Sequence, residues 1–167
     1  EEADAIVINT CCFIHDAKEE SVNTILEMAE YKKTGTCKIL IVTGCMAQRY
    51  KEEITEEIPE VDAVLGTTSY GDIVKALNEA EAGHVFQEFK DINALPEDSG
   101  RRVITTGGHF GYLKIAEGCD KHCTYCIIPS LRGKFRSVPE ERLLKQAEYM
   151  ASQGVRELIL VAQETTV

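Results

Sequence analysis

The sequence predicts an α/β fold, because short apolar runs alternate along the chain with amphipathic stretches. Three apolar runs in the first half are typical of buried parallel strands, since residues on both faces are apolar; they span residues 5–8, 39–42 and 61–65. Of the 167 residues, 44% are hydrophobic and 7% aromatic, as in a soluble globular protein. This length suffices for one ordinary domain or two small ones.

Helices are expected between these strands. A helical repeat after the first strand comprises Val22, Ile25, Leu26 and Ala29. Asp16, followed three residues later by Glu19, resembles a capping arrangement that would start this helix. Ile73, Val74 and Leu77 give a further apolar stripe that ends near Gly83. Residues 1–83 are therefore predicted to form a doubly wound parallel sheet.

Residues 84–110 break this pattern and are predicted to be a linker between two domains. Their turn signals are Pro96, residues 98–100 and residues 105–108.

Residues 111–167 are predicted to open a partial βα (TIM) barrel. Residues 112–115 form the expected first strand, and a helix should begin near Ser137 and Pro139 and end at Gly154. Its apolar stripe is Leu143, Leu144, Ala147 and Met150. Residues 158–161 form the next strand. Active sites of such barrels gather at the C-terminal strand ends, where the residues after 115 would lie.

Three cysteines follow that first strand with the spacing Cys119-x3-Cys123-x2-Cys126. Thiolates are soft anionic ligands, and three from one loop can hold a 4Fe–4S cluster while leaving one iron without a protein ligand. Gly118 would allow a tight turn into the loop. Two alternatives stay open: a chance group of structural cysteines, and a zinc site that takes His122 as its fourth ligand.

The surrounding residues are similar to the radical S-adenosylmethionine (SAM) methylthiotransferases, most closely to the RimO type that modifies a ribosomal protein. In this comparison Tyr125 is the aromatic residue of the cluster motif. The similar stretches cover nearly the whole chain: residues 7–11, 17–21, 42–45, 111–119 and 127–133.

The resemblance implies two 4Fe–4S clusters and SAM. SAM bound at the open iron would be cleaved to a radical that removes hydrogen from an unactivated carbon. A methylthio group would then reach the β-carbon of an aspartate in the twelfth small-subunit ribosomal protein. Cys11 and Cys45, each just after a predicted strand, would hold the auxiliary cluster, and a third ligand would precede Glu1. We therefore expect a piece of a longer protein, cut at both ends and inactive alone.

The resemblance also indicates supporting residues. Tyr125 would lie near the adenine through its backbone, and Gln163 and Glu164 would meet the SAM amine. Arg132, with Lys134 and Arg136, forms a basic patch that could hold the SAM carboxylate or an acidic substrate group. Each also has a plain structural interpretation, as a packing aromatic, a strand-end polar residue or a solvated face. Cys12, where a glycine is usual, and Cys37 are expected to be bystanders, and His15, His84 and His109 have no predicted role.

The net charge of −10 is concentrated in the first half. Residues 1–80 hold 16 acidic and 7 basic side chains, whereas residues 111–167 hold 7 and 8. An acidic surface favours a basic partner and makes nucleic acid a less favoured one, although it could serve solubility alone. The sequence has no run that suggests a membrane span, and an odd count of seven cysteines favours reduced thiols. We expect a cytoplasmic protein supplied by a reducing electron donor.

Three hypotheses therefore follow from the sequence. The first is a methylthiotransferase that modifies a ribosomal protein. The second uses the same chemistry on an adenosine of transfer RNA, as in the MiaB type. The third is a non-catalytic zinc or iron–sulfur module.

Overall fold

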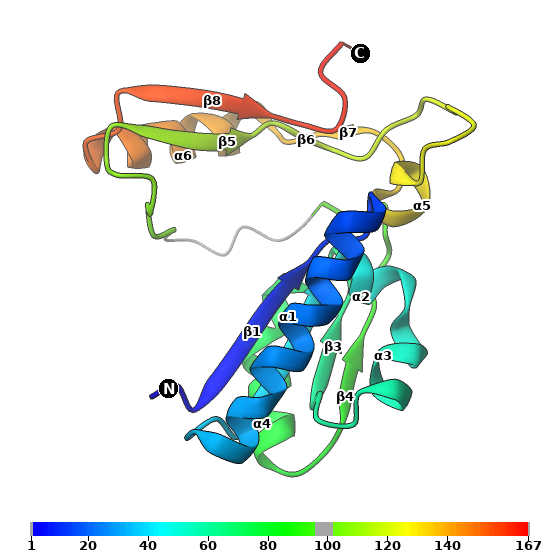
Figure 1. Ribbon diagram of the computed structural model, residues 1–167. Coiled ribbons are helices and arrows are strands. Elements are labelled where there is room, and N and C mark those ends of the chain that lie inside the picture. The colour runs from blue at the N-terminus through cyan, green and yellow to red at the C-terminus, as the bar shows by residue number, and fades with distance from the viewer. Residues whose placement is uncertain (1, 96–101, 167) are drawn as a thin grey trace. The chain divides into compact units, whose positions relative to one another are not determined.

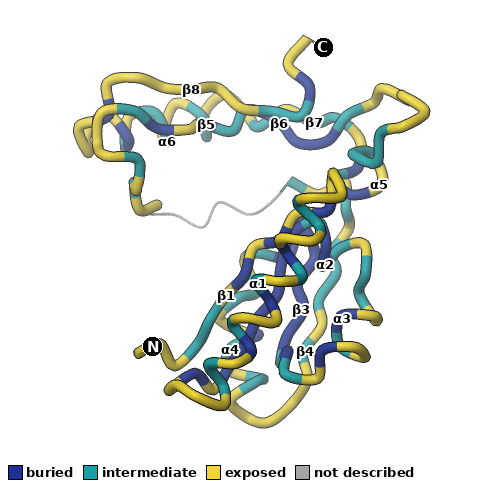
Figure 2. The backbone as a smooth tube through the Cα atoms, viewed as in Figure 1, coloured by how far each residue is buried: buried dark blue, intermediate teal, exposed yellow. Residues whose placement is uncertain are grey.

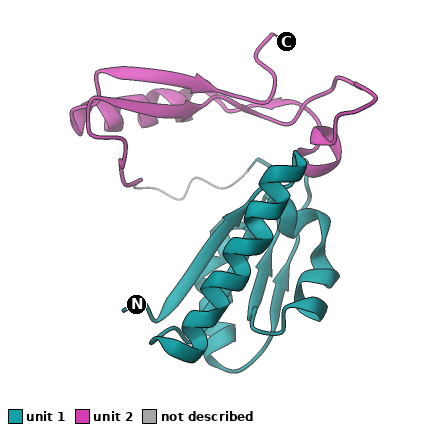
Figure 3. Ribbon diagram, in the orientation of Figure 1, with its two compact units in different colours: residues 1–96 teal, residues 97–167 magenta. Residues whose placement is uncertain are grey.

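The computed structural model describes residues 2–95 and 102–166. The chain divides into two compact units, residues 1–96 and residues 97–167 (Figures 1 and 3). The predicted turn residues Pro96 and 98–100 lie outside the described residues. No helix in the described part of the chain has the length and apolar character needed to cross a membrane.

Unit 1 contains a four-stranded, fully parallel sheet in the order β1-β2-β3-β4. The strands are β1 (Ala5–Thr10), β2 (Ile39–Gly44), β3 (Ala63–Leu65) and β4 (Phe86–Glu88). The helical segments are α1 (His15–Thr34), α2 (Cys45–Arg49), α3 (Lys51–Glu57), the 3-10 turn η1 (Tyr70–Asp72) and α4 (Ile73–Glu81). In Figure 1, α1 covers one face of the sheet and α4 the other, which confirms the predicted doubly wound α/β arrangement.

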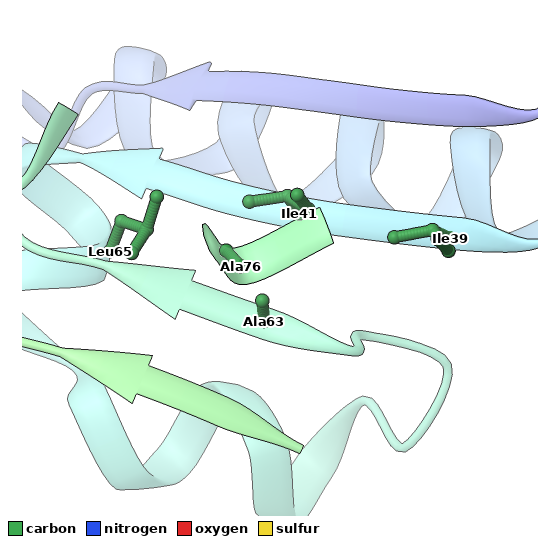
Figure 4. Close-up of a cluster of buried hydrophobic side chains, with 5 residues drawn as sticks. All are labelled: Ile39, Ile41, Ala63, Leu65 and Ala76. Carbon is green, nitrogen blue, oxygen red and sulfur yellow. The ribbon is translucent and has the colours of Figure 1, made fainter. Parts of the chain in front are cut away.

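The face under α4 holds a cluster of five buried apolar side chains (Figure 4). They are Ile39, Ile41, Ala63, Leu65 and Ala76. Because successive strand residues point to opposite faces, Leu40, Val42 and Val64 lie on the side of α1, and all three are fully buried, as is Ile25 of α1. Strand β2 is thus covered on both faces, which explains its unbroken apolar run.

The start of α1 differs from the prediction. The helix begins at His15 with Ile14 at the N-cap, and no side chain caps it, so Asp16 and Glu19 do not form the expected capping arrangement. Asp16 lies instead in the first turn, where a carboxylate interacts favourably with the helix dipole. Spacing alone could not show which residue would leave the helical conformation.

Strand β4 was not predicted from the sequence. This strand lies within residues 84–110 and pairs in parallel with β3. With three residues, it is too short to show a reliable periodic pattern.

Unit 2 contains the predicted strand–helix–strand unit. Strand β5 (Phe110–Lys114) pairs in parallel with β8 (Glu157–Val161), and helix α6 (Glu140–Ser152) lies between them in the sequence. A second, antiparallel pair is formed by β6 (Ala116–Glu117) and β7 (Arg136–Ser137), and between these lies helix α5 (Ile128–Arg132). Figure 2 shows β8 as exposed along its length.

Candidate functional site

The three motif cysteines lie on one loop between β6 and α5, residues 118–127, which we call the cysteine loop. Cys119 and Cys126 are half-buried, Cys123 is exposed, and all three are thiols rather than halves of disulfides. The Cys126 N–H donates to the Cys123 carbonyl at 3.0 Å, which closes a turn between them. Three soft donors on one short loop are chemically suited to an iron–sulfur cluster.

A site for a single metal ion, such as zinc, would need several ligand side chains around one point. Within the described residues, no three His, Cys, Asp or Glu side chains are placed to surround a single metal.

Backbone contacts fix the entry to the cysteine loop. Gly118 has a φ of 76°, in the left-handed region that favours glycine. A Cβ at this position would lie 2.2 Å from the carbonyl oxygen of Lys134. The Cys119 N–H donates to the Gly133 carbonyl at 3.2 Å, and the Phe135 N–H donates to Asp120 Oδ1 at 2.9 Å. The start of the loop is therefore tied to residues 133–135.

The residues that follow β8 also contact the cysteine loop. Gln163 Oε1 accepts a hydrogen bond from the Gly118 N–H at 3.0 Å. Glu164 is buried and forms an ion pair with Lys121, which lies between two of the cysteines in the sequence. Two residues predicted to meet SAM are thus brought to the loop from about 40 positions away in the chain.

The Glu164 carboxylate is held in its charged form. Lys121 is the largest cause of a fall in its pKa to about 2, and hydrogen bonds from Thr166 add to the effect. The Thr166 N–H donates to Glu164 Oε1 at 2.8 Å, and the Thr166 hydroxyl donates to the same oxygen at 2.6 Å. This carboxylate is therefore ionised at any physiological pH and is available to a cation.

Lys121 lies near the sulfur ligands as well as near Glu164. Its pKa is raised, first by the hydrogen bond to Glu164 and further by the charges of Cys119 and Cys123. Lys121 has no role predicted from the sequence. Its position between two cysteines of the motif is the sequence feature that could have indicated one.

Glu117 is a second buried carboxylate beside the loop that the sequence analysis missed. It directly precedes Gly118, and its Oε1 pairs with Lys114 and lies 3.7 Å from Arg132 Nη1. Arg136 Nη1 donates to the carbonyls of Arg132 and Lys134 at 2.9 and 2.7 Å. The predicted basic patch is thus partly used in local contacts.

Tyr125 differs from the other predicted site residues because it is 88% exposed. Its predicted proximity to an adenine stays a prediction.

The two cysteines predicted to hold the auxiliary cluster lie at one edge of the unit 1 sheet. Thr10 at the end of β1 is in register with Gly44 at the end of β2, so Cys11 and Cys45 leave neighbouring strands side by side. A Cβ on Gly44 would lie 2.4 Å from the Thr10 carbonyl oxygen, so the glycine permits this close approach. Ser21 Oγ accepts from the Cys11 N–H at 3.0 Å and donates to its carbonyl at 2.9 Å.

Cys12 is buried next to Cys11 and Cys45. Burial is the main cause of a raised pKa of its thiol, the charge of Cys45 adds to the rise, and Arg49 opposes it through charge and a hydrogen bond. Cys11 is exposed whereas Cys12 is buried, so the two neighbouring side chains diverge as expected. Arg49, one turn after Cys45 on α2, was not singled out from the sequence.

Cys37 lies elsewhere, buried, with its thiol donating to the Ile39 carbonyl at 3.4 Å. The histidines without a predicted role have local partners: His15 lies 4.0 Å from Glu19, His84 lies 3.2 Å from Glu79, and His109 contacts the ring of Phe110.

Two family models match the chain. Residues 1–66 match the uncharacterized protein family UPF0004, and residues 113–167 match the radical SAM superfamily. The chain is 66% identical over 166 residues to the ribosomal protein uS12 methylthiotransferase RimO of Lachnoclostridium phytofermentans. The proteins of the same name from Clostridioides difficile and Desulfitobacterium hafniense are 52% and 47% identical.

The chain belongs to the radical SAM methylthiotransferase family. Each of the three alignments covers 99% of this chain, but the chain spans only 37–38% of the length of these relatives. Membership of the radical SAM superfamily implies SAM and 4Fe–4S chemistry, and the cysteine loop lies inside the matched region.

Proposed function

We propose that this chain is part of an enzyme that adds a methylthio group to an aspartate β-carbon of ribosomal protein uS12. The observation that carries the proposal is the cysteine loop. It contains three thiols and is joined to the residues after β8 by the contacts of Gly118 with Gln163 and of Lys121 with Glu164. Relatives with 47–66% identity are named ribosomal protein uS12 methylthiotransferases. Because the chain spans little more than a third of them, the activity belongs to the full-length protein.

Cys119, Cys123 and Cys126 would hold three irons of a 4Fe–4S cluster. When bound, the cluster supplies the electron that splits the sulfonium of SAM. Glu164, ionised and buried, would accept the ammonium group of SAM, while Arg132 would attract its carboxylate. Gln163 acts through the loop by holding the Gly118 N–H, and Tyr125 would lie beside the adenine.

Cys11 and Cys45 would supply two of the three ligands of an auxiliary cluster that carries the sulfur to be transferred. Their positions after neighbouring parallel strands support this role, because both side chains leave the same sheet edge. The third ligand would come from outside these 167 residues. The chain alone should therefore fail to transfer a methylthio group to a peptide.

Anaerobic reconstitution with iron and sulfide tests the cluster. The chain should develop broad visible absorbance that changes on addition of SAM, and replacement of Cys119, Cys123 and Cys126 by alanine should abolish it. Cys37→Ala is the matched control. Cys37 is a buried cysteine of the other compact unit and is not part of the cysteine loop. A colourless chain that binds one zinc per molecule would instead support the non-catalytic module.

Mass spectrometry of cells that lack the full-length gene tests the substrate. Ribosomal protein uS12 should lose the mass of a methylthio group, while transfer RNA should be unchanged. The opposite result would assign the enzyme to transfer RNA. The excess of acidic residues over residues 1–80 favours a basic protein as the partner over nucleic acid, because this surface repels a phosphate backbone.

A further inference from the structure

The Glu164 carboxylate accepts three contacts from the chain itself. Its Oε1 accepts two hydrogen bonds from Thr166, and its Oε2 pairs with the Lys121 ammonium. Thr166 is two residues away in the chain, so its contacts are local, whereas Lys121 comes from the cysteine loop. A second ammonium group at this oxygen would be repelled by the like charge of Lys121, so its binding favours a position of Lys121 away from Glu164.

Lys121 can move at little cost. Its side chain is 57% exposed, and its other contact is a 3.4 Å hydrogen bond to the Thr166 hydroxyl. Because the ammonium group of SAM would take the place that Lys121 leaves, the buried Glu164 carboxylate would not be left unpaired. A released Lys121 would remain on the cysteine loop, between Cys119 and Cys123 in the sequence.

We propose that Lys121 is an internal substitute for the ammonium group of SAM, which occupies Glu164 until the nucleotide binds and displaces it. The two groups share their charge and their donor geometry, so they compete for one carboxylate. This inference rests on the proposed function and adds a regulatory contact to it, because Lys121 and SAM would compete for Glu164. When SAM binds, Lys121 is transferred from Glu164 to the neighbourhood of the cluster ligands.

The first test measures SAM affinity of the reconstituted full-length protein, from the change that SAM causes in the electron paramagnetic resonance spectrum of the reduced cluster. Lys121→Met should lower the Kd for SAM by about two- to five-fold, because the competing cation is gone. Lys121→Arg should keep the wild-type Kd, since arginine also pairs with a carboxylate. Lys145→Met, an exposed lysine of α6, is the matched control for loss of one positive charge.

Ligand analogues separate competition from general electrostatics. S-adenosylhomocysteine keeps the ammonium group but lacks the sulfonium charge, so it should gain as much affinity from Lys121→Met as SAM does. Methylthioadenosine lacks the ammonium group, so its affinity should not change. An equal gain for methylthioadenosine, or an unchanged or weaker SAM affinity in Lys121→Met, would overturn the inference.

A second measurement needs no variant. Anaerobic labelling of the wild-type protein with an amine-reactive reagent, read by mass spectrometry, should show faster modification of Lys121 when SAM is added, with Lys145 unchanged. Slower or equal labelling of Lys121 would contradict its release. Failure of SAM binding itself is distinguishable, because the spectrum of the reduced wild-type cluster would then not change when SAM is added. Modification of transfer RNA instead of uS12 would leave both experiments unaffected.

Discussion

Gly118 connects β6 to Cys119, the first proposed cluster ligand, in a conformation that other residues avoid, and its backbone lies against that of Lys134. Gly118→Ala should therefore lose most of the bound iron, because a Cβ 2.2 Å from a backbone oxygen forces the loop to shift. Iron per chain after anaerobic reconstitution is the measurement.

Gly108→Ala is the matched control for Gly118→Ala. Gly108 has a φ of 87° and open space around its Cβ position. The Gly108→Ala protein should lose about 1–2 kcal/mol of unfolding free energy, because alanine is strained in the left-handed conformation, yet it should bind iron normally. Full iron content in Gly118→Ala would show that the loop tolerates the displacement.

Gln163 holds the backbone of Gly118 through one hydrogen bond. Gln163→Leu removes the acceptor of the Gly118 N–H, and losing such a bond costs about 1 kcal/mol. Hydrogen exchange at the Gly118 amide should accelerate by about five-fold, whereas Gln163→Glu, which keeps the oxygen, should stay near wild type. Equal exchange in both variants would mean that the contact does not hold the loop.

At the scale of elements, the sequence predicts those parts that have a strong local pattern. Strands β1 and β2 and the crossover from β5 through α6 to β8 were anticipated from apolar residues and turn signals. The predicted burial is correct for β2 but wrong for β1, an edge strand on which Val7 is 43% exposed. The two-residue strands β6 and β7 have too few residues to show a period. They form because Glu117 and Arg136 are brought together by the loop between them, which local patterns do not encode.

The candidate site shows the same limit. The spacing of Cys119, Cys123 and Cys126 predicted the loop, because three ligands on eight residues are a local signal. The contacts of Lys121 with Glu164 and of Gly118 with Gln163 join residues more than 40 positions apart. Such pairs follow from the return of β8 alongside β5, so they could be found only after the strands were placed.

Helix α6 allows a test of the predicted apolar stripe. The stripe included Leu144 and Met150, but Met150 is fully buried, with its Cε where a Cβ on Gly111 would lie, whereas Leu144 is 55% exposed. Met150→Ala should therefore lower the unfolding free energy of unit 2 by about 2–5 kcal/mol. Leu144→Ala should change it by about 0.5 kcal/mol or less. Urea unfolding of the two variants, followed by far-ultraviolet circular dichroism, would contradict this if the losses were equal.

The whole molecule has an uneven charge distribution that bears on how it meets its substrate. Residues 1–80 carry 16 acidic and 7 basic side chains, so the proposed substrate should be attracted over a distance if it presents a basic surface. Association of the full-length protein with uS12 should slow by about ten-fold or more when ionic strength rises from about 0.05 to 0.5 M. The dissociation rate should change much less. Stopped-flow fluorescence separates the two rates, and an association rate independent of salt would exclude electrostatic attraction.

The distribution of cluster ligands over the chain leads to a prediction about stoichiometry. The three proposed ligands of the SAM cluster lie on one loop, so these 167 residues should bind about four irons, whereas the full-length protein should bind about eight. In the 167-residue chain, Cys11→Ala with Cys45→Ala should leave the iron content unchanged, because two thiols do not complete the auxiliary site. Replacing the three loop cysteines should remove nearly all iron. If the chain bound about eight irons, Cys12 beside Cys45 would be the first candidate for the missing ligand, and Cys12→Gly should then halve the iron content.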